Sequence, residues 1–348
     1  MPRFLPLLIG FLSLTACSGW GDREYVPRDL NPEDGAPAEL VVRNETRERM
    51  EFGRQMRDLL QAGRYDSLEH IARGLRQQRV KWPNGQWKLR SFYVQGFDGP
   101  NQETETHWKV FLGQLRGWVA ARPTSLTAQV ALGTALRGYA WHARGEGWSH
   151  EVSNPGRRLF QKRLSEADSV LRASQRLTGY CPGMRASLLR VALGAGWEGS
   201  SYDSVFNAAI EAEPTYEAYY EHKAYRLLPR WYGAKGDWER FAAEAADHIG
   251  GPEGDAMYAR IVWSLWEYHE NMFKDTAASW ERTSRGYQHL LRTYPHSLEL
   301  QSQYAILAAQ AENRAQARLM FDRMGPRIDP AVWYSRERFV GVRDWAMQ

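Results

Sequence analysis

The sequence predicts an all-α fold, a superhelix of helical hairpins with irregular aromatic-rich insertions. Two observations predict it. In the first, an apolar residue is followed three positions later by a small or apolar residue and eight positions later by a proline. Phe206, Ala209 and Pro214 have this spacing, and residues 287–295 repeat it. A new amphipathic segment follows such prolines. Recurrence at a period near 34 residues is typical of stacked hairpins, because each hairpin buries its apolar face only against its neighbours. We therefore expect one elongated domain.

The composition is that of a folded protein, and it argues against nucleic-acid binding. The 348 residues are 43% hydrophobic and 25% charged, and the formal net charge is only +4. Arginines are spread evenly, whereas nucleic-acid-binding proteins concentrate lysine and arginine on one face. The 15 Trp and 17 Tyr are many for this length. Core packing between helices is favoured over aromatic platforms in a groove, because aromatic residues dominate packing energetics.

The first residues predict a secretory signal. Arg3 precedes an apolar run over residues 4–14, and small residues then lead to Cys17. Such a segment is too short to span a membrane as a stable helix. The Leu-Thr-Ala-Cys string resembles a bacterial lipobox, which implies removal of residues 1–16 and lipidation of Cys17. Ser18, in place of Asp, favours the outer membrane, facing the periplasm. The alternative is an ordinary signal peptide with an accidental cysteine.

Residues 17–42 predict a lipidated N-terminus followed by a tether, and residues 43–348 a helical domain. The tether is rich in proline and glycine and poor in large apolar side chains. If Cys17 carries lipid, Cys181 has no cysteine partner, so stability must come from the core. Cys181 precedes a helix start, where a thiolate is stabilised, but no base is identified for it; an inert thiol is favoured over a nucleophile.

The first helical hairpin is predicted from Asn44, which is a plausible helix N-cap. Its turn, at residues 63–66, contains Gly-Arg-Tyr-Asp and resembles the turn of a tetratricopeptide hairpin; the alternative is any generic helical pair. Residues 81–101 differ, because they hold an Asn84-Gly85 turn signal and an aromatic stretch at 91–97 without a clean period. We expect a short hairpin or a capping loop there.

The rest of the chain predicts further helices separated by one insertion. The small apolar residues of 127–144 allow helices to approach closely. Residues 145–156 are too long for a hairpin turn and form an insertion, which is where functional loops tend to occur. Asp237 is the expected N-cap of the helix that follows it. The remaining expected helices are 103–121, 160–171, 186–194, 202–212, 217–228, 238–249, 256–273, 276–293, 297–311 and 315–324.

Several local strings resemble a bacterial family with a domain of unknown function, number 4034. They are Gly-Gln-Trp-Lys-Leu at 85–89 with Phe-Tyr at 92–93, Trp-His-Ala-Arg-Gly at 141–145, Pro-Arg-Trp-Tyr-Gly at 229–233 and Gly-Asp-Trp-Glu at 236–239. The resemblance covers roughly residues 45–275, with the last tetratricopeptide-like repeats at about 276–335. It implies a helical fold and no established activity.

The first candidate binding group lies at the insertion: Trp141, His142, Arg144 and Trp148, with His150 beside them. Two indoles, a guanidinium and imidazoles could line a pocket, and histidine is a ready acid or base. The competing interpretation is that Trp141 packs and His142 bonds a carbonyl. Packing is favoured, because no nucleophile is fixed by spacing.

The second candidate group is Arg230, Trp231, Tyr232 and Trp238, in a glycine-rich loop. Their rings could stack on sugars, which suits a protein near peptidoglycan. They could equally pin an unusual turn, and this is favoured, because aromatic clusters usually follow packing.

No catalytic, cofactor or metal motif is found in the sequence. The histidines are scattered, and no phosphate loop or nucleophile elbow is present. We therefore expect no metal and no cofactor. Glu217 and Glu221 lie one helical turn apart, and an exposed helix surface is favoured for them over a general-acid pair.

The favoured function is an envelope protein-interaction scaffold, which binds a protein or peptide partner in a helical-repeat groove. The alternative is a glycan- or peptidoglycan-binding protein or a cell-wall enzyme that uses the loops around His142 and Trp231. A secretion or toxin accessory role is a third reading. Enzymatic activity is left open, with its absence favoured. The discriminating feature is whether the two aromatic loops converge on one deep pocket with a perturbed acid or base.

Overall fold

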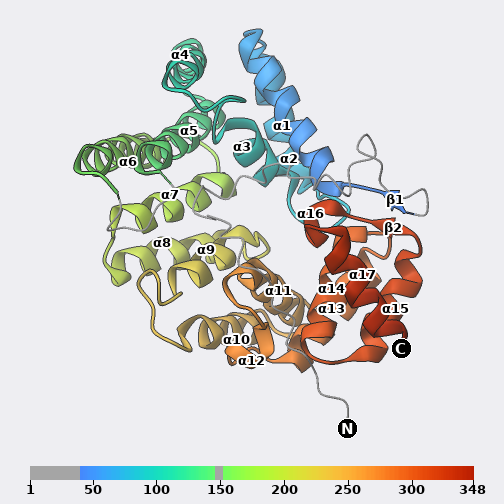
Figure 1. Cartoon of the computed structure of the whole chain (residues 1–348). Coiled ribbons are helices and arrows are strands. Elements are labelled where there is room, and N and C mark those ends of the chain that lie inside the picture. The colour runs from blue at the N-terminus through green and yellow to red at the C-terminus, as the bar shows by residue number, and fades with distance from the viewer. Residues whose placement is uncertain (1–39, 146–151) are drawn as a thin grey trace.

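The computed structural model describes residues 40–145 and 152–348, and these residues form an all-α array. Figure 1 shows the helices following one another around a curve, so that the first and last elements meet. The described part has one two-stranded sheet, in which β1 (Val41–Val42) runs parallel to β2 (Arg327–Ile328). The all-α prediction is confirmed, but the expected elongated domain is instead an array whose two ends touch.

The first half of the array is built of paired helices. They are, in chain order, α1 (Glu45–Gln61), α2 (Tyr65–Gln78), α3 (Lys88–Phe97), α4 (Glu105–Ala121), α5 (Leu126–Arg144), α6 (Asn154–Ser174), α7 (Pro182–Ala195), α8 (Gly199–Ala212) and α9 (Ala218–Arg226).

The second half continues the pairing and ends in two helices that the sequence did not predict. The elements are α10 (Asp237–Ile249), α11 (Gly251–Ser264), the short 3₁₀ helix η3 (Trp266–Tyr268), α12 (Met272–Asp275), α13 (Trp280–Thr293), α14 (Leu298–Gln310), α15 (Arg314–Met324), α16 (Pro330–Trp333) and α17 (Arg336–Met347).

Of the two N-caps that the sequence predicted, one is confirmed and one is wrong. The Asn44 side chain accepts a hydrogen bond from the Arg47 amide at 2.8 Å, so the predicted cap of α1 is confirmed. Asp237 is not a cap. Gly236, at φ +92°, occupies that position, and the Asp237 carboxylate accepts from the Ala234 amide at 2.7 Å. The carboxylate folds back because the glycine permits a left-handed turn just before it.

Two further sequence predictions were wrong for physical reasons. Residues 91–97 belong to helix α3, which is buried on most sides, so no amphipathic period marks it. The single helix expected over 256–273 ends at Ser264, and Asn271 then caps α12 by accepting from two amides. The apolar spacing continues across this break because Trp266 and Met272 also enter the core.

Close approach of the paired helices requires small residues, as predicted for 127–144. α5 packs along α6, and a Cβ on Gly133 would lie 2.5 Å from Cδ2 of Leu171. A Cβ on Gly138 would lie 1.8 Å from the carbonyl oxygen of Asp98, beside α3. These contacts leave no room for a side chain, so they fix the spacing of α3, α5 and α6.

The hairpin at residues 81–87 bridges the two halves of the array. Asn84 and Gly85 form its turn, as predicted, and Lys81 pairs with Trp87 in an isolated bridge. The Arg260 guanidinium of α11 donates to the carbonyl oxygen of Asn84 at 2.7 Å. Gly85 has φ +80°, and a Cβ there would lie 2.4 Å from the Tyr294 ring. Only glycine fits this turn against the second half.

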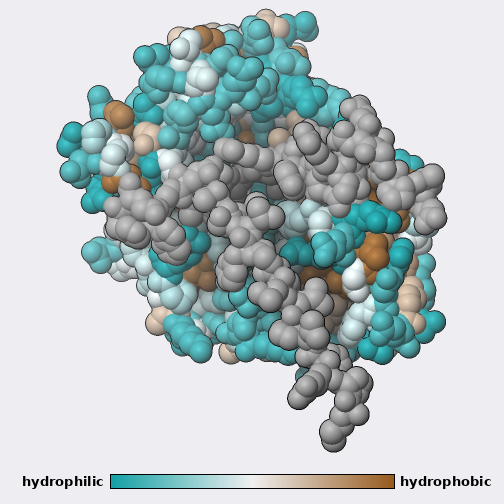
Figure 2. All heavy atoms as spheres, in the orientation of Figure 1, coloured by the Kyte–Doolittle hydropathy of each residue, from teal (hydrophilic) through white to brown (hydrophobic). Residues whose placement is uncertain are grey.

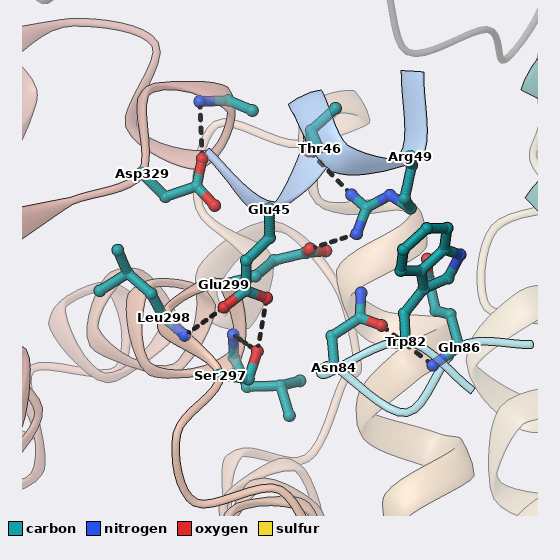
Figure 3. A network of polar contacts seen from close by, with 12 residues as sticks. Glu45, Thr46, Arg49, Trp82, Asn84, Gln86, Ser297, Leu298, Glu299 and Asp329 are labelled. Carbon is teal, nitrogen blue, oxygen red and sulfur yellow. Dashed lines mark hydrogen bonds and ion pairs between the residues drawn. The ribbon is translucent and has the colours of Figure 1, made fainter. Parts of the chain in front are cut away.

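A polar network closes the array where α1 meets the start of α14 (Figure 3). The Glu45 carboxylate accepts from the Leu298 amide at 2.7 Å and from the Ser297 hydroxyl at 2.9 Å. The carboxylate therefore satisfies free donors at the positive end of α14. One turn along α1, Arg49 forms a 2.7 Å ion pair with Glu299, and both side chains are only 6% exposed.

Asp329 lies at the edge of this network and is buried. Its Oδ1 accepts from the Ala331 amide at 3.1 Å, which caps α16, and its Oδ2 has no hydrogen-bond partner among the described residues. Burial raises the pKa of Asp329 to about 8, and the nearby carboxylates Glu299 and Glu45 add to this rise. The fold therefore favours the protonated acid.

We predict that the Arg49–Glu299 pair is strongly coupled. Arg49→Met should destabilise the fold by about 3 kcal/mol, because it leaves a buried carboxylate without its counter-charge. The double variant Arg49→Met/Glu299→Gln should be less destabilised than the sum of the single variants, as measured by urea unfolding. The exposed pair Arg122 and Asp66, 2.7 Å apart, is the matched control and should show little coupling. Additive losses at Arg49 and Glu299 would contradict the prediction.

We predict that Asp329→Asn changes the pH dependence of stability. Between about pH 4 and pH 8, Asp329 is protonated in the folded protein but ionised in the unfolded chain, because folding raises its pKa. Wild-type stability should therefore fall relative to the variant as pH rises through that window and level off above it. The relative change should be at least about 1.4 kcal/mol, the equivalent of one pKa unit. Chemical unfolding at pH 5 and pH 9 measures it, and parallel profiles would refute it.

Candidate functional site

A pocket lined by charged side chains lies among four alternate helices of the array, α3, α5, α7 and α9. Figure 1 shows α3, α9 and α11 toward the middle of the view, whereas α4, α6 and α10 lie at its rim. The cavity itself is small, about 20 Å³, and it opens into a wider mouth. We call it the arginine pocket; the side chains that define it are Arg90 of α3, Arg137 of α5, Arg190 of α7, and Tyr216 and His222 of the α9 segment.

Two of the three arginines have carboxylate partners. Arg90 lies 2.6 Å from a carboxylate oxygen of Glu221. Arg137, with a side chain only 3% exposed, lies 2.6 Å from Asp98. Each of these buried charges is therefore matched by an opposite charge, as burial requires.

Arg190 differs from the other two. Within residues 40–145 and 152–348 it makes no ion pair, and its Nε has no hydrogen-bond acceptor. Burial, with the charges of Arg137 and Arg90, lowers the pKa of Arg190 to about 10, and Asp98 offsets part of this. The guanidinium thus stays protonated at neutral pH, so the pocket keeps a positive charge that its own carboxylates do not neutralise.

His222 is held neutral in this pocket. Burial lowers the pKa of His222 well below its usual value, and Arg190, Arg90 and Arg137 lower it further. The ring can therefore donate one hydrogen bond and accept another at neutral pH.

The sequence predicted an exposed helix surface for Glu217 and Glu221, but both side chains are buried. Their exposed fractions are 2% and 4%. Glu217 accepts from the Trp87 amide at 3.2 Å, and burial raises its pKa despite the opposing effect of Arg90. The prediction failed because Arg90, the counter-charge that permits burial, comes from a distant part of the chain.

The two predicted aromatic loops converge beside the arginine pocket. The Trp141 and Trp231 ring centroids are 6.1 Å apart, edge to face, and Tyr225 lies 5.7 Å from Trp231. We call Trp141, Tyr225, Trp231, Tyr232 and Tyr268 the aromatic cluster. Trp141 follows Arg137 by one turn of α5, and Tyr225 follows His222 by one turn of α9, so pocket and cluster share one face.

The edge of the cluster carries three of the predicted residues. The Arg144 guanidinium lies 5.4 Å from the Trp141 ring centre, and Arg230 lies 5.5 Å from that of Tyr268. Tyr232 is 48% exposed and donates its hydroxyl to the Leu193 carbonyl at 2.9 Å. Arg144 and Arg230 therefore place two positive charges against rings of the aromatic cluster.

The other predicted residues are not brought together here. His142 packs against Trp108 and Tyr139, because neighbouring positions on a helix point about 100° apart. Trp238 is buried in α10 beside His269. Trp148, like His150, lies outside the described residues.

Sequence reasoning missed the arginine pocket, although a signal existed. Arg137 lies in a run of small and apolar residues in the middle of α5, and Arg190 lies between Leu189 and Val191 in α7, whose one other charged residue is Arg185. A charged residue inside a buried helix must meet a counter-charge, a cavity or a ligand, because an isolated buried charge is costly. That conflict between residue type and helix environment could have identified both positions.

Two wider grooves elsewhere contain several ion pairs. A groove beside α2 contains Arg122, which pairs with Asp66 at 2.7 Å. Another, beside α13, contains Arg282 and Arg285, which both pair with Asp255.

Cys181 is buried and donates weakly to the Tyr93 hydroxyl at 3.3 Å. Across the described ranges no group of three or more His, Cys, Asp or Glu is arranged to hold a metal ion. Among the helices of the same ranges, none is long and apolar enough to cross a membrane.

Comparison with known proteins identifies one related family over part of the chain. The model of a family described as a domain of unknown function (DUF4034) matches residues 53–176. This match contains α2 to α6, with Arg90, Arg137 and Trp141, but it ends before α7 and α9. No curated protein matches the chain.

Proposed function

We propose that the protein is an envelope lipoprotein that serves as a protein-interaction scaffold on tetratricopeptide-like hairpins. The observation that carries this proposal is the convergence of the arginine pocket and the aromatic cluster on one inner face. Arginine, tryptophan and tyrosine dominate the binding energy of many protein interfaces, particularly in partly enclosed pockets. A face with these residues, formed by successive hairpins, suits a peptide or protein segment.

The outer surface supports the same proposal. On the face drawn in Figure 2, the visible described residues are mainly hydrophilic, with hydrophobic residues scattered among them. The exposed large apolar side chains include Val110 of α4, Leu159 of α6 and Leu319 of α15, which lie on different helices. Scattered apolar residues of this kind are normal on a soluble surface, so the inner face is the stronger candidate for binding.

The lipid anchor is part of the proposal and rests on the lipobox-like string before Cys17. Three acyl chains would hold the protein at the membrane, since one chain alone binds only marginally. The tether over residues 17–42 would let the helical domain reach a partner in the periplasm.

We predict one dominant protein partner in crosslinked cells. Crosslinking in intact cells, detergent extraction and mass spectrometry should recover it with the wild type and lose it with Trp141→Ala/Trp231→Ala. The matched control is Trp345→Ala, a half-buried tryptophan of α17 on another part of the array. All three proteins should show comparable circular dichroism melts. Recovery of glycan fragments without a protein partner would instead support cell-wall binding.

We predict that Cys17→Ser moves the protein from the membrane fraction to the soluble fraction. Loss of the sulfur removes the attachment site of the diacylglyceryl group. Fractionation and immunoblotting measure this, and a Cys181→Ser variant is the control, since that thiol is buried in the core. Persistent membrane association of Cys17→Ser would show that the anchor lies elsewhere.

A further inference from the structure

The inner face contains an unusual concentration of hydrogen-bond donors without acceptors. Within the described residues, Nε and Nη1 of Arg137, Nε of Arg190, and the indole Nε1 atoms of Trp141 and Trp231 are buried and have no acceptor. A buried donor left unsatisfied costs about 1–3 kcal/mol. These donors come from α5, α7 and the loop after α9, and they occupy the arginine pocket and the adjoining aromatic cluster.

The charge of the pocket indicates the class of acceptor. Arg90 is matched by Glu221, and Arg137 is matched by Asp98. Glu217 faces Arg90 at 4.0 Å and also interacts with Arg260. Among the three arginines of the pocket, this leaves Arg190 without a carboxylate of its own in the described residues, so one negative charge would complete the balance.

A carboxylate fits this requirement better than a phosphate monoester. It carries one negative charge and offers two oxygens in the plane that a guanidinium recognises. A phosphate monoester carries nearly two charges at neutral pH, and the second would be desolvated in a pocket that has only one excess positive charge.

We propose that the arginine pocket binds a single carboxylate of the partner segment, with Arg190 as its counter-ion. This inference rests on the proposed scaffold function and names the chemistry that the inner face recognises. The carboxylate accepts from Arg190 and Arg137, and His222 supplies a neutral hydrogen-bond partner. The adjoining part of the ligand is apolar or aromatic, because the aromatic cluster begins one helical turn away, about 5.4 Å along α5.

The test uses three matched probes and the full-length protein in detergent. The probes are 3-phenylpropionate, its neutral isostere 3-phenylpropanamide, and phenyl phosphate, with binding followed by ligand-observed NMR and calorimetry. We expect 3-phenylpropionate to bind at least tenfold more tightly than the amide, and its affinity to fall as salt is raised. Equal binding of acid and amide, or tighter binding of phenyl phosphate, would overturn the proposal.

Substitution of Arg190 separates a binding role from a structural one. Arg190→Met keeps the length of the side chain and removes its charge, so it should weaken 3-phenylpropionate at least tenfold without lowering the melting temperature. Arg285→Met, at an exposed arginine paired with Asp255, should leave binding unchanged. A lower melting temperature together with unchanged binding would show that Arg190 is a structural residue.

The failure of this inference can be told apart from failure of the scaffold function. If Arg190→Met still captures the crosslinked protein partner that Trp141→Ala/Trp231→Ala loses, the scaffold function holds and the carboxylate assignment is wrong. If both variants lose the partner and 3-phenylpropionate competes with it, the assignment is supported.

Discussion

The closure between α1 and α14 is the constraint on which the rest of the array depends. Glu45 and Arg49 lie one turn apart, so one face of α1 both caps α14 and pairs with Glu299. Because these contacts are buried, they are sensitive to geometry and hold the ends at a defined distance. A closed array cannot straighten, so the inner ends of α3, α5, α7 and α9 remain close together around the arginine pocket.

Most buried charges of the interior are paired or neutralised, and the candidate site contains one that is not. Buried charges are paired across long stretches of sequence, as Arg49 is with Glu299 and Arg90 is with Glu221. Asp329 is neutralised instead, because its raised pKa favours the neutral acid. Arg190 is neither paired with a carboxylate nor neutralised, since its pKa of about 10 leaves it charged at neutral pH. Arg226 is also buried without a carboxylate partner, but it donates to the Trp197 carbonyl at 2.7 Å, whereas Arg190 makes no hydrogen bond among the described residues.

The candidate site was partly visible in the sequence. Trp141, at the end of α5, and Trp231, in a loop, stood out by residue type, and the structure brings their rings together. His142 and Trp238 stood out equally but face other parts of the core, because position on a helix determines direction. Arg137 and Arg190 were overlooked, since their significance depends on burial, which the sequence does not state.

Most of the helices follow from local signals in the sequence. Periodic apolar residues, the Asn44 cap, the Asn84-Gly85 turn and the small residues of α5 are local signals that act through local sterics and hydrogen bonds. Only the tertiary structure decided that the ends meet, that Glu217 is buried, and that the arginine pocket adjoins the aromatic cluster. Those outcomes depend on contacts between residues more than a hundred positions apart, such as Trp87 with Glu217, and no local pattern encodes them.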